Sequence, residues 1–286
     1  MGEPSFFVGV GAQRSGTTWV GHYLRRLPDV RFSPIKEINY FDSKYVEARR
    51  GAVHYRFNTK LAVLGLGNYT RKHPRSGAAL SYHYLGIRRL RDASYRAYFD
   101  ELARSGQTAG EISPSYAMLD EAAIDAMDRL LGGPKYFFIM RNPVDRLVSQ
   151  YSFLSSRPEL ALPTGGEDLA ERLLNLSQIS QHTDYAKSLA RYLSVVPETR
   201  FRVMFTEALF GEETSQLECD GLCDFLGVGR ATVDRQTNVN RAPAVSIDKE
   251  IRRKLVGSLS EQYRFVGARY GDALPASWQS DVALLN

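Results

Sequence analysis

The sequence has few cysteines and lacks long apolar runs. Two of its 286 residues are cysteine, and no apolar stretch reaches the roughly 18 residues that a membrane-spanning helix needs. Cys219 and Cys223 lie four residues apart in a predicted helix with no further metal ligands nearby, so we expect reduced thiols in a core. These scarcities exclude a disulfide-rich scaffold and a membrane-spanning protein.

A long run of like charges is also missing. The chain has 37 Lys and Arg against 32 Asp and Glu, a net charge of +5, and its basic residues are dispersed. The excess of positive charge favours anionic ligands. The dispersion of the basic residues argues against a nucleic-acid partner. His54, His73 and His83 lack the spacing of metal ligands, so no metal is expected. The first apolar run begins at Phe6, which leaves no room for a signal peptide and predicts a cytoplasmic protein without a transmembrane segment.

The chain has the composition of one large globular domain spanning residues 1–286, with 43% apolar and 24% charged residues. Predicted strands alternate with predicted helices, which indicates an α/β fold: a P-loop-like parallel sheet with helices on both faces. Residues 45–95 are rich in Tyr, His, Arg and Gly and have poor periodicity, with 72–77 as the least structured part. Such a segment either caps the sheet or forms an insertion or lid that binds the acceptor. Strands are expected at 6–10, 30–32, 108–112, 136–140 and 201–205.

The exit of the first strand has the features of a phosphate-binding loop. An apolar run is followed by Gly11 and Gly16, and a helical pattern begins at Thr17, so backbone N–H groups at a helix N-terminus could hold an anion. The spacing of the two glycines matches the Walker A loop, but Thr17 stands at its lysine position and the cation comes earlier, as Arg14. A glycine-containing turn between any strand and helix is the simpler alternative.

A second basic corner follows the strand at 136–140. Arg141 is predicted at the carboxyl end of that strand, Asn142 can cap the next helix, and Pro143 suits its first turn. Ser149 falls about two turns along the helix on a nearby face. A guanidinium there can bind a phosphate in bidentate geometry. We interpret Asp145 and Arg146 as charges on the helix surface.

Two local sequences resemble motifs of sulfotransferases that use 3′-phosphoadenosine 5′-phosphosulfate (PAPS). Arg-Ser-Gly-Thr-Thr-Trp at 14–19 resembles their 5′-phosphosulfate loop, and Arg-Asn-Pro-x-Asp-Arg-x-x-Ser-x-Tyr at 141–151 resembles their 3′-phosphate motif. This resemblance implies that Arg14 contacts the bridging oxygen and the sulfonate, and that Arg141 and Ser149 bind the 3′-phosphate. The residues implied at the 5′-phosphate are Ser15, Gly16, Thr17, Thr18 and Trp19.

Three weaker matches resemble the heparan-sulfate-type, or carbohydrate, sulfotransferases. Lys-Glu-x-x-Tyr-Phe at 36–41 resembles a segment whose glutamate is the catalytic base, which implies Glu37 as base with Lys36 beside it. A solvated pair that opens a helix is the alternative. Gly-Glu-x-Ser-Pro-x-Tyr at 110–116 resembles a strand end that lines the cleft, and 237–243 loosely resembles a loop that closes over the nucleotide, with Arg241 as a third phosphate contact. The resemblance implies that Glu111, Ser113 and Tyr116 contact the acceptor or support the residues that do.

The resemblance implies transfer of a sulfonate group from PAPS to a hydroxyl of a small-molecule or saccharide-type acceptor. The histidine base motif of cytosolic steroid and phenol enzymes is absent, which argues against a small phenol. Two alternatives stay open: a P-loop nucleotide kinase-like enzyme, and a nucleotide-binding homologue without catalysis.

Overall fold

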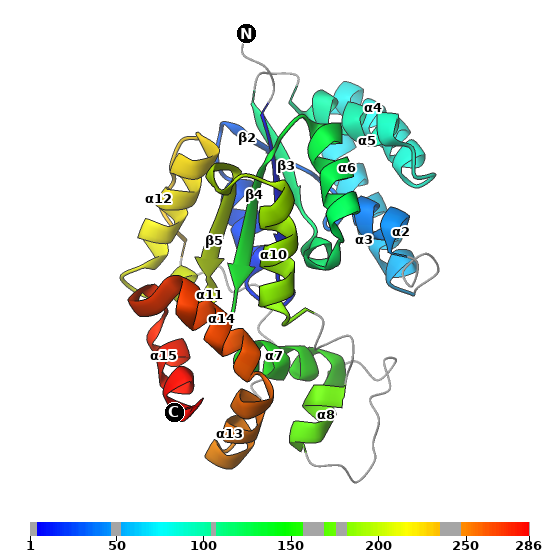
Figure 1. The fold of residues 1–286 in the computed structure, drawn as a ribbon. Helices are drawn as coiled ribbons and strands as arrows, with labels where there is room; N and C mark the ends of the chain where they lie inside the picture. Colours follow the sequence, from blue (N-terminus) through cyan, green and yellow to red (C-terminus); the bar gives the residue numbers. More distant parts are fainter. Residues whose placement is uncertain are drawn as a thin grey trace.

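The computed structural model describes residues 5–46, 53–103, 107–156, 169–175, 182–234 and 247–285. Within them, five strands form one sheet in the order β2-β3-β1-β4-β5, and every pairing is parallel (Figure 1). The predicted strands and the α/β fold class are therefore confirmed. The strands are β1 (Phe6–Gly11), β2 (Val30–Phe32), β3 (Thr108–Ile112), β4 (Lys135–Met140) and β5 (Phe201–Phe205).

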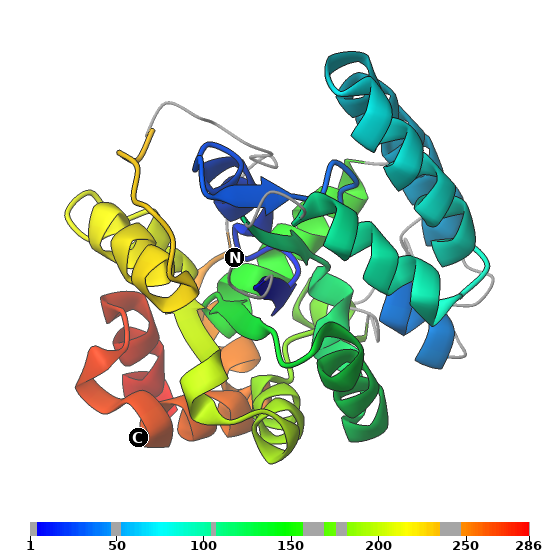
Figure 2. The same ribbon diagram turned by 90° about the horizontal axis from the view of Figure 1, so that it is seen from above.

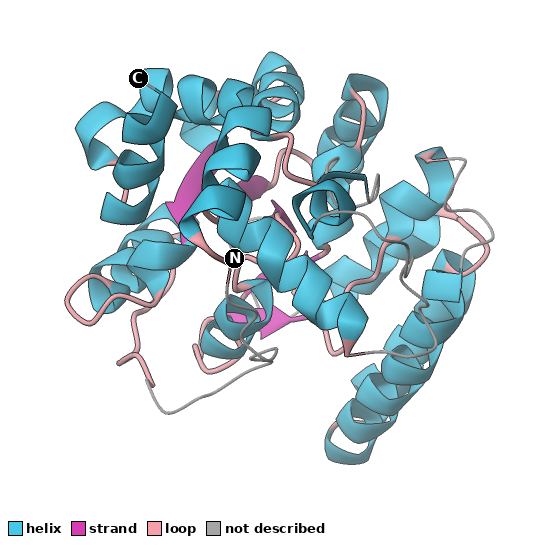
Figure 3. Ribbon diagram, turned by 90° about the horizontal axis from the view of Figure 1, so that it is seen from below, coloured by secondary structure: helices cyan, strands magenta, loops and turns pink. Residues whose placement is uncertain are grey.

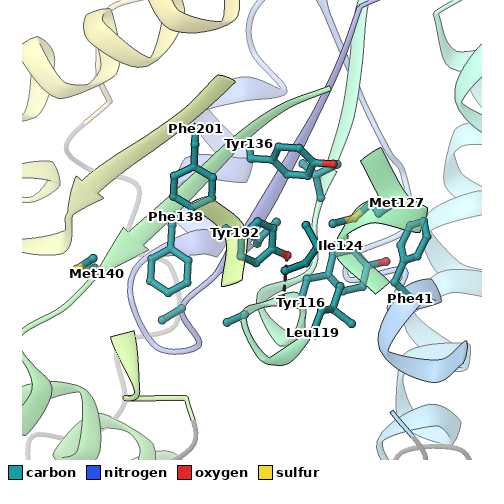
Figure 4. Packing of buried hydrophobic residues seen from close by; sticks show 14 of the residues in the cluster. Phe41, Tyr116, Leu119, Ile124, Met127, Tyr136, Phe138, Met140, Tyr192 and Phe201 are labelled. Atoms are coloured by element: carbon teal, nitrogen blue, oxygen red, sulfur yellow. Dashed lines mark hydrogen bonds between the residues drawn. The ribbon is translucent and has the colours of Figure 1, made fainter. Parts of the chain in front are cut away.

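Helices cover both faces of the sheet because successive residues of its central strand point to opposite sides. Phe6, Val8 and Val10 of β1 pack into a core formed with α5 (Asp92–Leu102), α6 (Glu121–Leu131) and α10 (Tyr185–Val195). Phe7 points the other way, into a second core with α1 (Thr17–Leu24) and α12 (Ser215–Leu226). Figure 4 shows part of the first core, where Tyr136 and Phe138 of β4 lie beside Tyr192, and Figure 3 shows the helices around the sheet. Cys219 and Cys223 are buried free thiols of the second core, as expected.

The segment between β2 and β3 is helical, although its poor periodicity did not indicate this. It contains α2 (Tyr40–Tyr45), α3 (Val53–Lys72) and α4 (Pro74–Ile87), and α3 and α4 pack side by side at the edge of the molecule (Figure 2). The prediction that 72–77 is unstructured was wrong. Glycines at tight contacts account for the weak pattern: a Cβ at Gly77 would lie 2.5 Å from Thr70 Cα, and one at Gly65 would lie 2.2 Å from the Pro34 carbonyl oxygen.

The last part of the chain is helical. Two helices meet at Leu259, and a further helix carries the fully buried Trp278. No helix among the described residues is long and apolar enough to cross a bilayer. The remaining helices are α7 (Pro143–Ser155), α8 (Leu169–Asn175), α11 (Thr206–Leu209), α13 (Lys249–Ser258), α14 (Ser260–Tyr270) and α15 (Ala276–Val282), with short 3₁₀ segments at 114–118, 198–200, 271–273 and 283–285.

Candidate active site

The order of the strands predicts a ligand crevice at the carboxyl ends of β1 and β4. The chain leaves β1 toward β2 on one side of the sheet and leaves β4 toward β5 on the other, although β1 and β4 are neighbours. In open parallel sheets, ligands bind outside the carboxyl ends of the strands at such a reversal. The loop after β1 carries Arg14 and Ser15, and β4 ends at Met140, immediately before Arg141. The two predicted phosphate loops therefore meet at the position where the fold favours a ligand.

The loop after β1 exposes helix N–H groups to this crevice. Arg14 and Gly16 have φ angles of 66° and 85°, and no side chain caps the N-terminus of α1. The left-handed backbone at position 16 favours glycine. A Cβ there would also lie 2.9 Å from the Phe210 ring, which is a second reason for glycine. Ser15 is fully buried, and its hydroxyl oxygen has no hydrogen-bond partner among the described residues. An uncapped helix N-terminus with an unsatisfied buried hydroxyl is suited to an anion.

Direct contacts join the two loops. Arg141 Nη1 donates to the Arg14 carbonyl oxygen at 3.0 Å, and Arg14 Nε donates to Ser149 Oγ at 3.4 Å. The Arg14 guanidinium also lies 4.5 Å from the centre of the Phe153 ring. The structure thus brings Arg14, Ser15, Arg141 and Ser149 together, and their binding of phosphate groups stays a prediction.

The C-terminal helices hold the corner that follows Arg141. Asn142 caps α7 by accepting from the backbone N–H groups of Val144 and Asp145, as predicted, and its amide nitrogen donates to Asp281 at 2.7 Å. Asp281, which is buried, accepts two hydrogen bonds of 2.7 Å from Arg252. Arg252 also pairs with Asp145 at 2.9 Å. The position of Arg141 therefore depends on residues more than 100 positions later in the chain.

Arg146 is a buried cation rather than the predicted surface charge. Its exposed fraction is 0%, and its Nε donates to Thr183 Oγ1 at 2.8 Å. Burial lowers the pKa of Arg146 to about 10; repulsion from Arg141 and Arg14 adds to this, while Tyr185 opposes it. Three guanidinium groups thus repel one another around the crevice, and a bound anion would relieve this repulsion.

The predicted base lies on the loop after β2. Glu37 has a φ of 53° and Lys36 Nζ lies 3.8 Å from its Oε1. The Lys36 side chain is 43% exposed and that of Glu37 is 24% exposed, so solvent or a substrate can reach both. Lys36 also affects His22 of α1. Burial lowers the pKa of His22, and the positive charges of Arg25 and Lys36 lower it further.

Glu111, Ser113 and Tyr116 lie beneath this loop, and each is buried. Glu111 accepts hydrogen bonds from Ser113 Oγ at 2.6 Å, Tyr95 Oη at 2.7 Å, Tyr116 Oη at 3.0 Å and the backbone N–H of Ile38 at 3.1 Å. Ser113 and Tyr116 also accept from the backbone N–H groups of Asn39 and Tyr40. The three residues therefore hold the segment 38–40 from below, and their role as direct acceptor contacts stays a prediction.

Burial of Glu111 makes a pH-dependent contribution to stability. Burial raises the pKa of its carboxyl group above the usual 4.5, and the hydrogen bonds from Ser113 and Tyr95 partly offset the effect. A raised folded-state pKa stabilises the fold below the unfolded value, and this contribution is lost as pH rises through the folded value. Glu111→Gln should therefore be less stable than the wild type by about 1–3 kcal/mol near pH 4, and the difference should shrink toward pH 8.

Denaturant unfolding at several pH values measures this difference. The exposed Glu213→Gln serves as control and should follow the wild type throughout. A gap between wild type and Glu111→Gln that widens with pH would show that the fold favours the charged carboxylate instead.

Sequence reasoning missed an exposed aromatic residue beside the phosphate loop. Phe210, which is 53% exposed, lies 5.4 Å from Trp19 between ring centres, and Trp19 stacks on Tyr23 at 6.3 Å. Nothing in the sequence around Phe210 indicates that it lies near the phosphate loop. The one available signal is its position at the end of the short helix after β5. The predicted phosphate contact Arg241 lies outside the described residues.

The carboxyl ends of β1 and β4, the three guanidinium groups and the uncapped helix define an α/β protein whose site is suited to an anionic ligand. The chain belongs to the sulfotransferase family, because the sequence model described as "Sulfotransferase family" matches residues 4–231. No curated protein sequence matches the chain significantly. Among the described residues, no group of three or more His, Cys, Asp or Glu could hold a metal ion.

Solved structures resemble the fold over its whole length. The crystal structure of a sulfotransferase from Alicyclobacillus acidocaldarius matches with a TM-score of 0.61 and 20% identity, covering 98% of this chain and 100% of that one. The sulfotransferase domain from the curacin biosynthetic pathway matches with a TM-score of 0.51 and 18% identity, covering 99% and 97%. At such identities the similarity establishes the fold alone.

Proposed function

We propose that the protein transfers a sulfonate group from PAPS to a hydroxyl group of a polar acceptor. The observation that carries this proposal is the contact between the two basic corners, in which Arg141 donates to the Arg14 carbonyl and Arg14 donates to Ser149. PAPS carries two separate phosphate groups, at its 3′ and 5′ positions. Two adjoining cationic sites fit this pattern better than a single triphosphate cradle does.

The residues around the crevice fit the donor. Ser15 Oγ and the N–H groups at the start of α1 would hold the 5′-phosphate, and Arg141 with Ser149 would hold the 3′-phosphate. Arg146 adds a buried positive charge behind them. The exposed ring of Phe210 beside Trp19 offers a surface on which an adenine base can stack.

Glu37 and Lys36 would supply the chemistry on the acceptor side. The acceptor oxygen attacks the sulfur atom, the bond between sulfur and the 5′-phosphate oxygen breaks, and the acceptor proton passes to the Glu37 carboxylate. Negative charge then grows on the departing phosphate, where Arg14 and Lys36 stabilise it. The products are the sulfated acceptor and adenosine 3′,5′-bisphosphate.

The exposed carboxylate favours an aliphatic hydroxyl as acceptor. Such a hydroxyl has a high pKa, and a carboxylate base suits proton removal late in the transition state. The match of 36–41 and 110–116 to heparan-sulfate-type enzymes supports a carbohydrate-containing acceptor. Within 45–95, α3 contacts the Pro34 carbonyl, close to Lys36, which supports a role for this segment in binding the acceptor.

Calorimetry with adenosine 3′,5′-bisphosphate in metal-free buffer tests the proposal. The bisphosphate should bind tightly, and ATP with Mg²⁺ should bind more weakly. Preference for ATP with Mg²⁺ and no binding of the bisphosphate would favour a kinase-like enzyme. Bisphosphate binding without transfer of labelled sulfonate to any acceptor class or to water would favour a non-catalytic nucleotide-binding protein.

A substitution of Ser15 should affect ligand affinity and protein stability differently. Because it lacks a partner in the free protein, Ser15→Ala should leave the free energy of unfolding unchanged or raise it by up to about 1 kcal/mol. The same change should weaken bisphosphate binding about tenfold, because a phosphate oxygen loses a donor. Thermal unfolding and calorimetry measure the two effects. Ser280→Ala, which removes an exposed hydroxyl that bonds within its own helix, should change neither. Loss of stability without loss of affinity would show that Ser15 is structural.

A further inference from the structure

The segment around α3 and α4 has a strong charge asymmetry. Between residues 48 and 91 there are ten Lys or Arg and no Asp or Glu, although the whole chain carries a net charge of only +5. The other residues together are therefore acidic on balance. The asymmetry does not produce a run of consecutive like charges, because the basic residues are spaced along the segment.

The outer face of α4 joins these cations to exposed apolar side chains. Arg75, Ala78, Tyr82, Leu85 and Arg89 recur at intervals of three and four residues, so they form one stripe along α4 and its C-terminal turn, and all five are exposed. Tyr82 is 73% exposed and Leu85 is 56% exposed. The opposite face, which contains Leu80, Tyr84 and Ile87, is buried against the protein. Both faces of α4 therefore carry apolar residues, and the described residues cover only one of them.

The cations around this stripe have no acidic partner among the residues that the structure describes. No ion pair joins Arg71, Lys72, Arg75, Arg89 or Arg91 to any residue that the structure describes. The nearest acid in sequence, Asp92, already accepts from Lys44 at 2.5 Å and from the Tyr40 hydroxyl. An anionic surface could therefore bind these cations without first breaking an ion pair.

We propose that the α4 stripe, with the cations Arg71, Lys72 and Arg91 beside it, docks the protein on a membrane that contains anionic lipids. Arg75 and Arg89 lie about 21 Å apart along the helix, with Tyr82 between them. Helices that lie in a membrane interface combine Lys or Arg with apolar and aromatic residues, and clusters of four to eight such cations are typical of anionic-lipid binding. Here the cluster is shared between elements, because Arg71 and Lys72 end α3, Arg75 lies in α4, and Arg89 and Arg91 follow α4. Tyrosine is favoured at this interface because its ring is apolar and its hydroxyl is polar.

Two other occupants fit the stripe less well. A second copy that docked through the same stripe about a two-fold axis would place Arg75 opposite the copy's Arg89, which is repulsive. An acidic protein would need carboxylates spaced to match cations that are spread over about 21 Å of a convex helix. A membrane surface does not require this match in spacing, because anionic headgroups are present all over it. Figure 2 shows α3 and α4 as the cyan pair at the edge of the molecule, where a flat surface can approach them.

Co-sedimentation of the full chain with vesicles tests this proposal. Binding is expected to phosphatidylcholine vesicles that contain about 30% phosphatidylglycerol, but not to pure phosphatidylcholine, and it should be lost in about 0.5 M NaCl. The double variant Arg75→Glu with Arg89→Glu should bind about tenfold more weakly or worse. The matched control, Arg253→Glu with Arg264→Glu, makes the same charge change at exposed positions of α13 and α14 and should stay within about twofold of the wild type.

Fluorescence of Tyr82→Trp reports whether the stripe itself touches the lipid. Its emission should shift to the blue on anionic vesicles, whereas the native Trp19 and Trp278 are already buried and should change little. Absence of vesicle binding, equal losses in both double variants, or binding without a blue shift would each overturn the proposal. Binding to soluble polyglutamate in place of vesicles would instead indicate an acidic protein partner. Thermal unfolding of each variant verifies that it folds.

Discussion

Replacing Arg141 with alanine should weaken the binding of adenosine 3′,5′-bisphosphate about 100-fold or more, because two charge-assisted hydrogen bonds to the 3′-phosphate are lost. The variant also loses the hydrogen bond to the Arg14 carbonyl, so some disorder of the first loop is expected. Calorimetry with the bisphosphate measures the change in affinity. Adenosine 5′-phosphosulfate, which lacks a 3′-phosphate, should lose much less affinity for the variant than the bisphosphate does.

The conservative variant Arg141→Lys serves as a matched control. Lysine keeps the positive charge but cannot make two parallel hydrogen bonds, so its affinity for the bisphosphate should lie between those of the wild type and the alanine variant. An equal loss of affinity for both nucleotides would indicate that Arg141 supports the loops rather than the 3′-phosphate. Unchanged affinity for both would contradict the assignment altogether.

Replacing Glu37 with glutamine should lower turnover about 10²- to 10⁴-fold, the range typical of removing a general base, and should leave bisphosphate affinity within about twofold. Glutamine keeps the size of the side chain but cannot accept the acceptor proton. The side chain is partly exposed and pairs loosely with Lys36, so the fold should tolerate the change. Sulfonate transfer from labelled donor, measured with an acceptor found by screening, gives the rate.

His22 is the competing base near this loop. Its lowered pKa keeps it neutral and able to accept a proton at neutral pH, as a base requires. His22→Gln should nevertheless retain most of the turnover if Glu37 is the base. The reverse pattern, with Glu37→Gln active and His22→Gln inactive, would transfer the role to the histidine. His54 and His182 deserve the same comparison, although the His54 side chain is not described and His182 is buried.

The sequence predicted those parts of the fold that depend on local order. Strands β1 and β4 were found because five or six consecutive buried residues precede a turn, and Arg14 and Arg141 were placed because they follow these two strands. Asn142 and Pro143 mark the start of α7 by their own chemistry. These signals need no knowledge of the rest of the chain.

The features that the sequence did not reveal depend on distant partners. Arg146 has the spacing of a surface residue, but it is buried against Thr183, which lies 37 positions later. The four donors to Glu111 come from α5, from its own strand end and from the loop after β2, whereas its contact with an acceptor stays a prediction. The helices α3 and α4 pack through glycines, which contribute nothing to a hydrophobic pattern. Such contacts become visible only when the elements are assembled.

The attachment of Asn142 to the C-terminal helices affects how this protein can be recombined with its relatives. The family match ends at residue 231, yet Asn142 Nδ2 bonds to Asp281, and Arg252 joins Asp281 to Asp145. A chimera that exchanges only the matched segment would carry both phosphate motifs but set Asn142 against foreign helices. A chimera must therefore take the amide at 142 and the carboxylate at 281 from the same parent. The exchanged segment has to extend through the last helix.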